Sequence, residues 1–411
     1  MTRAQALPLA VSLWLAAATL ASAETPDCPP VEPGADLSGE PPAEGAAPSV
    51  LLILPKGTDG AIATAGLELG AGARLVDSRF SPLLCATVAR VEGAPGASPA
   101  SLIVRLPENA AAVLDDVYAP DAGPDATLPA AEASPAPLRP DPYRKQQWAH
   151  DALGVDAAQR VTQGAGVRVA LLDTRADAQH EDLRAVRVRS EAGGAPGQHG
   201  TLLAGIVGAA TGNGVGIAGI APRAALVSVP VCDGSARGDV CRLYAVLDGL
   251  DLAWSERAQI VNLSLVGPAN RALERAVRRL DTLGVALVAA SGNRPSATPA
   301  YPAAYPWVIG VAASDDDRKL APSGPLVDLT APGVEIVSTS ANGGYAFASG
   351  SSLAAAHVSG ALALLTAASG GDVAAARLAL FGAARRGAPR TPPALAPLCD
   401  ALARLGRACA Q

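Results

Sequence analysis

Short apolar runs alternate with amphipathic stretches in the second half of the chain. The runs cover residues 167–172, 225–231, 260–265, 285–290 and 307–311. In several intervening stretches, such as 270–283, apolar residues recur at intervals of three and four, which is typical of helices. Hydrophobic strands alternating with helices predict an α/β fold with a mostly parallel sheet and helices on both faces. Functional residues are expected at the carboxyl ends of the strands, where such sheets bind ligands.

The first third of the chain has a different pattern. Residues 24–48 are rich in Pro, Gly, Ala and Glu, and apolar runs follow at 49–54 and 83–91. Together with helix-compatible residues near 101–115, these runs predict a small α+β unit over residues 24–118.

A linker is expected between this unit and the larger domain. Residues 119–140 contain many Pro, Ala and Asp residues, and proline favours extended chain and blocks regular pairing. The larger domain is then expected over residues 141–386. Residues 387–411 are expected to form a C-terminal extension with a cysteine pair.

The first residues have the pattern of an export signal. Arg3 supplies positive charge, residues 6–21 are apolar, and Ala21-Ser22-Ala23 has the small residues of a cleavage site. A membrane anchor is the alternative, but the apolar run is shorter than the roughly 20 residues that span a bilayer. We therefore expect a signal peptide at residues 1–23 and a secreted or periplasmic mature chain with no membrane segment.

Composition narrows the classes of function. Hydrophobic residues make up 49% of the chain and aromatic residues only 3%, so the core must consist mainly of Ala, Val, Leu and Ile. A formal net charge of −6 argues against binding to nucleic acid.

Six cysteines follow the predicted signal peptide, and an even number in an exported chain indicates disulfides. Buried free thiols are the alternative. A zinc site is not supported, because the sequence has no C-x-x-C motif. The expected local bridges are Cys232–Cys241 and Cys399–Cys409, with Cys28–Cys85 left by elimination.

Three polar residues lie where this fold would place a catalytic site. Asp173 directly follows the first strand of the larger domain, and His199 begins a helix after a glycine-containing turn. Ser352 begins another helix after Gly350, where backbone N–H groups attract negative charge. Each residue taken alone also fits a role in a cap or a turn.

The other histidines are weaker candidates for a catalytic base. His357 lies five residues after Ser352, about 140° around the helix, and cannot reach the hydroxyl. His180 lies in an acidic loop, and His150 lies well before the first strand of the larger domain. His199 is therefore the best candidate.

Seven segments in order carry a resemblance to a known family. Three contain the candidate residues: Val-Ala-Leu-Leu-Asp-Thr at 169–174, His-Gly-Thr at 199–201, and Gly-Ser-Ser-Leu-Ala-Ala-Ala-His-Val-Ser-Gly at 350–360. The other four lie at 141–148, 261–265, 290–293 and 301–306. The chain resembles the subtilases over residues 141–386, and its order of Asp, His and Ser is the subtilisin order.

The resemblance implies a subtilisin-like fold and an exported serine endopeptidase that acts on proteins or peptides through an acyl-enzyme. By motif match, Ser352 would be the nucleophile, His199 the general base and acid, and Asp173 its partner. Asn293 would be the side-chain donor of the oxyanion hole. No cofactor is required. The implied substrate-binding residues are Ser264, Leu265 and Val266 on an edge strand, and Ala290, Ser291 and Gly292 on the opposite wall of the main pocket.

Several positions depart from the family pattern without removing a reacting group. Arg175 and Val266 replace glycines, Ala356 replaces a proline, and Leu353 replaces a methionine. Because Val266 and Ala300 would add bulk near the cleft, we expect a preference for small or slender side chains.

Two further expectations follow from the resemblance. Asp182 and Asn213 match positions that bind calcium in some subtilases, and a solvated loop is the alternative. Residues 24–118 match a pro-segment in position and size. Such a segment would assist folding, block the cleft as an intramolecular inhibitor and be removed, whereas a permanent accessory domain would stay attached.

Two other functions remain as alternatives. A catalytically silent subtilase fold would act as a binding protein, but the presence of Asp173, His199, Ser352 and Asn293 favours an active enzyme. An α/β-hydrolase esterase would have Gly-x-Ser-x-Gly and its histidine last in order, and neither holds at Ser352.

Overall fold

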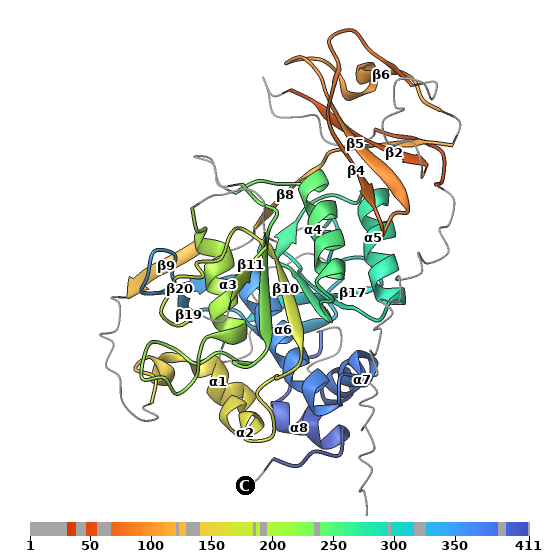
Figure 1. Ribbon diagram of the computed structural model, residues 1–411. Coiled ribbons are helices and arrows are strands. Elements are labelled where there is room, and N and C mark those ends of the chain that lie inside the picture. The colour runs from red at the N-terminus through yellow and green to blue at the C-terminus, as the bar shows by residue number, and fades with distance from the viewer. Residues whose placement is uncertain are drawn as a thin grey trace, which may run out of the picture.

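A seven-stranded sheet forms the centre of the larger domain (Figure 1). In the computed structural model the strand order is β11-β12-β10-β14-β16-β17-β18, and all neighbours are parallel. The strands are β10 (Arg168–Asp173), β11 (Arg187–Val188), β12 (Ala225–Pro230), β14 (Ile260–Leu263), β16 (Ala286–Ala290), β17 (Val308–Ser314) and β18 (Leu329–Pro332). The structure describes residues 31–37, 47–55, 67–107, 109–120, 123–128, 140–183, 186–189, 195–233, 239–294, 297–315, 326–384 and 392–409.

Each face of this sheet has its own hydrophobic core. In β10, Val169 and Leu171 belong to one core, and Ala170 and Leu172 belong to the other. The first core contains residues of α1 (Trp148–Leu153), α2 (Val155–Gln159), α3 (Gln198–Gly208), α6 (Ser351–Ala368), α7 (Val373–Ala383) and α8 (Leu398–Arg404). The second contains residues of α4 (Leu243–Ser255) and α5 (Arg271–Thr282). Burial on both faces explains the continuous apolar runs and confirms the predicted fold class.

Helix α6 runs through the middle of the first core. By length and composition it is the one helix in the described part of the chain that could cross a membrane, and 94% of it is buried in the protein. It packs against α3, α7 and strands of the central sheet, so its apolar residues meet protein all round.

Five strands between residues 34 and 114 form a second, mainly antiparallel sheet in the order β1-β7-β2-β5-β4, and β3 and β6 form a separate pair. The helix expected near 101–115 is wrong, because the described residues of this region form a short 3₁₀ turn and two strands and no α-helix. Ile103 and Val104 are β-branched, and Pro107 cannot continue a regular element. The elements are β1 (Gly34–Asp36), β2 (Ser49–Pro55), β3 (Glu68–Leu69), β4 (Arg74–Ser81), β5 (Ala86–Glu92), η1 (Pro99–Leu102), β6 (Ile103–Arg105) and β7 (Ala111–Leu114).

The stretch expected to be a linker contains two paired strands in its described part. β8 (Val117–Pro120) lies between β13 (Cys241–Arg242) and β15 (Leu265–Val266), antiparallel to both. β9 (Gly123–Leu128) pairs with β20 (Tyr345–Ser349), which also pairs with β19 (Ile336–Thr339). Proline does not prevent this pairing, because Pro120 is the last residue of β8, and Pro124 of β9 lies at a register shift in its pairing with β20. Residues 129–139 lie outside the described residues.

Two disulfides confirm the local cysteine pairs, Cys232–Cys241 and Cys399–Cys409. The second bridges α8 and the chain that follows it, within the C-terminal extension. Cys28 lies outside the described residues, as does the expected signal peptide at 1–23, so the pairing of Cys28 with Cys85 stays a prediction.

Candidate active site

Asp173 and His199 form a buried pair at the carboxyl edge of the central sheet. Asp173 ends β10, and His199 is the second residue of α3. His199 Nδ1 lies 2.7 Å from Asp173 Oδ1 and 2.8 Å from Oδ2. The backbone N–H of Thr174 donates to the same carboxylate at 2.7 Å. With its proton on Nδ1, the neutral imidazole carries its lone pair on Nε2, as a general base requires.

Gly200 allows α3 to begin against the chain that follows β10. A Cβ atom at residue 200 would lie 2.1 Å from the backbone oxygen of Thr174. The N–H of Gly200 instead donates to Thr174 Oγ1 at 2.9 Å. The first turn of α3 can therefore bring His199 against Asp173 only with glycine at this position.

Ser352 is the second residue of α6 and is buried beside the end of β14. Its Oγ donates to the backbone oxygen of Ser264 at 3.3 Å, and Ser264 Oγ donates to the backbone oxygen of Ser352 at 3.2 Å. Ser264 Oγ also lies 2.8 Å from Asn262 Oδ1, and Asn262 Nδ2 donates to Ser359 Oγ. This network fixes the start of α6 at the carboxyl edge of the sheet.

Asn293 lies next to the same helix start. Its Oδ1 accepts the N–H of Ser351 at 2.8 Å, which leaves Nδ2 as the donor group of the side chain. The N–H of Gly292 donates to Ser351 Oγ at 3.1 Å. Asn293 and the N-terminal end of an 18-residue helix thus provide donors where Ser352 begins.

The predicted substrate-binding residues lie on two segments of the chain, which are the two walls expected from the sequence. Leu265 and Val266 form β15, and Ala290 ends β16, followed by Ser291 and Gly292. The Cγ1 atom of Val266 lies 3.8 Å from the position that a Cβ of Gly292 would take, so the walls approach closely at Val266.

A strand of the same chain pairs with β15, which contains two of the predicted substrate-binding residues. In β8, Ala119 pairs with Val266, and Pro120 pairs with Leu265. Tyr118 is fully buried, and its hydroxyl donates to the backbone oxygen of Pro268 at 3.1 Å. Sequence reasoning missed this contact, although the β-forming residues Val117 and Tyr118 gave a signal for a strand.

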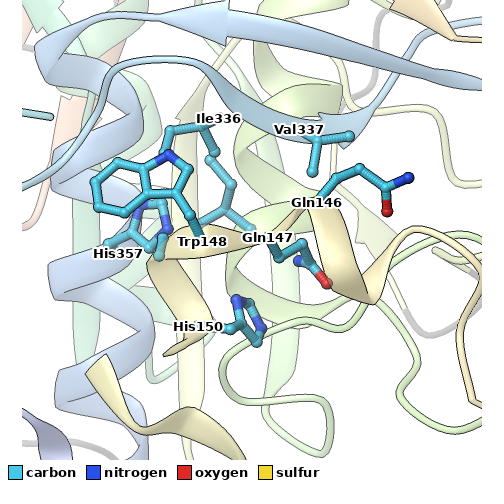
Figure 2. Close-up of a pocket in the computed structure, with 9 residues that line it drawn as sticks. Gln146, Gln147, Trp148, His150, Ile336, Val337 and His357 are labelled. Carbon is cyan, nitrogen blue, oxygen red and sulfur yellow. The ribbon is translucent and has the colours of Figure 1, made fainter. Parts of the chain in front are cut away.

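The other three histidines have structural surroundings. His180 Nε2 lies 2.7 Å from the backbone oxygen of Gly344, and His357 Nδ1 lies 2.8 Å from that of Leu353. Figure 2 shows His150 and His357 lining one small cavity together with Gln147 and Trp148. Burial lowers the pKa of His150 to about 3 and that of His357 to about 4.

Asp182 and Asn213, the predicted calcium ligands, are in contact. Asn213 Nδ2 donates to Asp182 Oδ1 at 2.7 Å, and the N–H of Ile217 donates to Oδ2 at 2.9 Å. Burial, with a smaller contribution from Asp141, raises the pKa of Asp182 to about 6. Within the described ranges there is no group of three or more His, Cys, Asp or Glu residues that could hold a metal ion. The remaining oxygens of these side chains also accept hydrogen bonds: Asp182 Oδ2 accepts from the Tyr345 hydroxyl at 3.1 Å, and Asn213 Oδ1 accepts the N–H of Val215 at 2.8 Å.

Comparisons with known proteins identify a family. A family model described as the subtilase family matches residues 164–377. The chain is 37% identical over 237 residues to thermitase from Thermoactinomyces vulgaris, covering 55% of this chain and 84% of thermitase. It is 38% identical over 214 residues to subtilisin Savinase from Lederbergia lenta, covering 49% of this chain and 77% of that protein.

A solved structure supports the fold as a whole. The crystal structure of fervidolysin from Fervidobacterium pennivorans, a keratinolytic enzyme related to subtilisin, has a TM-score of 0.69 to this chain at 22% sequence identity. The match covers 91% of this chain and 63% of fervidolysin, so it includes residues outside the central domain.

Proposed function

Because the chain belongs to the subtilase family and is a serine endopeptidase, we propose that it cleaves peptide bonds through Asp173, His199 and Ser352. The observation that supports this most strongly is the buried hydrogen bond between Asp173 and His199. It holds the imidazole at the edge of the sheet where α6 begins with the candidate nucleophile.

The proposed reaction has two proton-transfer stages. Ser352 Oγ attacks the carbonyl carbon while His199 Nε2 takes its proton and then passes it to the leaving amine, which gives an acyl-enzyme. Water then attacks the ester and gives its proton to His199, and Ser352 regains its proton as the acid leaves. Asp173 stabilises the imidazolium throughout. Asn293 Nδ2 stabilises the oxyanion, and loss of such a donor costs about 10²–10³-fold in kcat in subtilisin.

A fluorophosphonate probe tests the nucleophile. The processed enzyme should be labelled covalently, and Ser352→Ala should abolish the labelling. Ser255→Ala, at the exposed end of α4, is the matched control and should be labelled like the wild type. Wild-type protein that folds but takes no label would instead indicate a silent binding protein.

The proposed role of the small domain is that of an inhibitory pro-segment. β8 occupies the edge of β15, and its Tyr118 lies over Gly267, where a Cβ atom would come within 2.2 Å of the ring. A strand bound in this way excludes a second peptide from the same edge. Removal of the segment from an exported chain would then activate the enzyme outside the cytoplasm.

Calcium is proposed as a structural ion beside Asp182. A cation there would offset the burial of this carboxylate and its repulsion by Asp141. Asp182 and Asn213 would hold the ion through side-chain oxygens, which requires the amide of Asn213 to rotate by about 180° and its oxygen to give up the hydrogen bond from the N–H of Val215.

A further inference from the structure

The loop between β12 and β13 carries a carboxylate that the catalytic mechanism does not use. The loop starts at the catalytic aspartate, because the N–H groups of Val231 and Cys232 donate to the backbone oxygen of Asp173 at 2.9 and 3.3 Å. At its other end, Val240 exchanges two backbone hydrogen bonds with Asp233, at 2.8 and 2.9 Å. The disulfide Cys232–Cys241 joins the two ends. Asp239, next to Val240, is therefore held near the catalytic pair.

Asp239 interacts electrostatically with both members of that pair. Burial raises the pKa of Asp239, Asp173 raises it further, and His199 acts in the opposite direction. A carboxylate beside Asp173 experiences repulsion that a nearby cation would relieve.

The register between β13 and β8 indicates which residue of β8 lies opposite Asp239. In the antiparallel pair of β13 and β8, Cys241 lies opposite Tyr118. Continued for two residues beyond these paired positions, the register places Asp239 opposite Pro120. Directly opposed residues in antiparallel strands point to the same face, with Cβ atoms about 4.5–5.5 Å apart. Tyr118 is buried and Ala119 is exposed, so the side chain of residue 120 points toward the protein, as this alternation requires.

The pairing of β8 with β15 also shows where the position of Pro120 lies relative to the peptide bond that would be cleaved. Pro120 pairs with Leu265 on its other side, so a bound peptide that continued this register would place its next residue opposite Ser264. The backbone oxygen of Ser264 accepts the hydroxyl of Ser352, the proposed nucleophile. A peptide in the place of β8 would be cut after that residue, which makes the position of Pro120 the second before the scissile bond.

We propose that Asp239 selects substrates with lysine or arginine at the second position before the scissile bond. The proposal rests on the proposed function, because it assumes that substrates follow the path of β8. A basic side chain at this position forms an ion pair with Asp239. The pro-segment has the uncharged Pro120 there, so this ion pair is reserved for substrates.

A mutant cycle in the full-length chain tests the contact without catalysis. In a Ser352→Ala background, Pro120→Lys and Pro120→Gln both add a backbone N–H and differ only in side-chain charge and shape. We expect amide hydrogen exchange in β8 to be about two- to fivefold slower with lysine than with glutamine, as for a partly exposed ion pair. Asp239→Asn should remove this difference. Asp233→Asn, an exposed carboxylate of the same loop, should keep it.

Steady-state cleavage by the processed enzyme gives the second measurement. Two fluorogenic peptides that differ only by Lys or Gln at this position should differ about fivefold in kcat/KM, and Asp239→Asn should bring the ratio close to one. The ratio should also fall in 0.5 M NaCl. An unchanged lysine preference in Asp239→Asn, or no preference in the wild type, would overturn the proposal. If fluorophosphonate fails to label the wild type, the proposed catalytic function fails, while the mutant cycle still decides on Asp239.

Discussion

Single residues around the proposed catalytic side chains show how much of the site can be predicted from the sequence. Asp173, His199, Ser352 and Asn293 could be chosen from motifs, because each follows a strand or starts a helix. The supporting contacts could not be predicted in this way. Ser264 meets Ser352 across 88 positions of sequence, and no local pattern indicates that pairing.

The calcium proposal gives a prediction at this scale. Addition of Ca²⁺ should raise the unfolding temperature and EDTA should lower it, because an ion bound only to the folded state adds about 2.7 kcal/mol at 100 times its Kd. Asp182→Asn should abolish the response, and Mg²⁺ should not replace Ca²⁺. Differential scanning calorimetry measures the shift. An unfolding temperature that is equal with Ca²⁺ and with EDTA would exclude a stabilising site.

At the scale of elements, the central strands and helices followed from periodicity, whereas β8 did not. Its residues lie in a Pro- and Ala-rich region, and it becomes a strand because β13 and β15 provide two open edges. Such pairing is tertiary, so composition alone indicates a linker. The small domain also caps α4 and holds the residue that caps α5. Asp115 Oδ1 accepts the N–H of Tyr244 in the first turn of α4, and Asp116 Oδ2 accepts from Asn270, the N-cap of α5.

Asp115→Ala should therefore loosen the small domain. Loss of a helix cap costs about 1 kcal/mol, which corresponds to about fivefold faster hydrogen exchange in β8 if the segment opens as a unit. The measurement uses Ser352→Ala protein, which keeps the chain intact. Glu68→Ala, on β3, is the control and should leave the exchange unchanged. Equal exchange in the two variants would argue that Asp115 does not hold the segment.

The whole molecule follows the fold class that strand and helix order predicted. The sequence does not predict how the small domain packs against the larger one, because this packing depends on contacts between residues far apart in the chain. Arg79 of β4, for example, pairs with the buried Asp251 of α4 at 2.6 Å, over 172 positions of sequence.

Buried histidines make global stability depend on pH. Burial lowers the pKa of His150 from 6.5 to about 3 and that of His357 from 6.5 to about 4. At a pH between its folded and unfolded pKa values, each histidine is protonated in the unfolded chain and neutral in the folded one. Each histidine therefore lowers the free energy of unfolding as pH falls, by about 1.4 kcal/mol per pH unit where the difference is one proton. Asp116 and Asp182, with pKa values raised to about 6, act with the opposite sign.

A variant separates these opposing effects. Urea unfolding measures the free energy of unfolding of the Ser352→Ala protein and of the same protein with His150→Gln. We expect the first value minus the second to fall by about 1.4 kcal/mol per pH unit from pH 6 to pH 4. The carboxylates cancel in this difference, because both proteins contain them. Parallel stability curves for the two proteins would show that His150 is not kept neutral in the folded state.

Because β8 is paired on both sides, we expect activity to appear with a delay after the chain is cut. Cutting the chain after this strand breaks one covalent bond, but both edges, the buried Tyr118 and the caps at α4 and α5 remain. The severed piece would stay in place until it unfolds or a working molecule digests it. Activity in a fresh preparation should therefore start slowly and then accelerate, because each liberated enzyme helps to liberate the next.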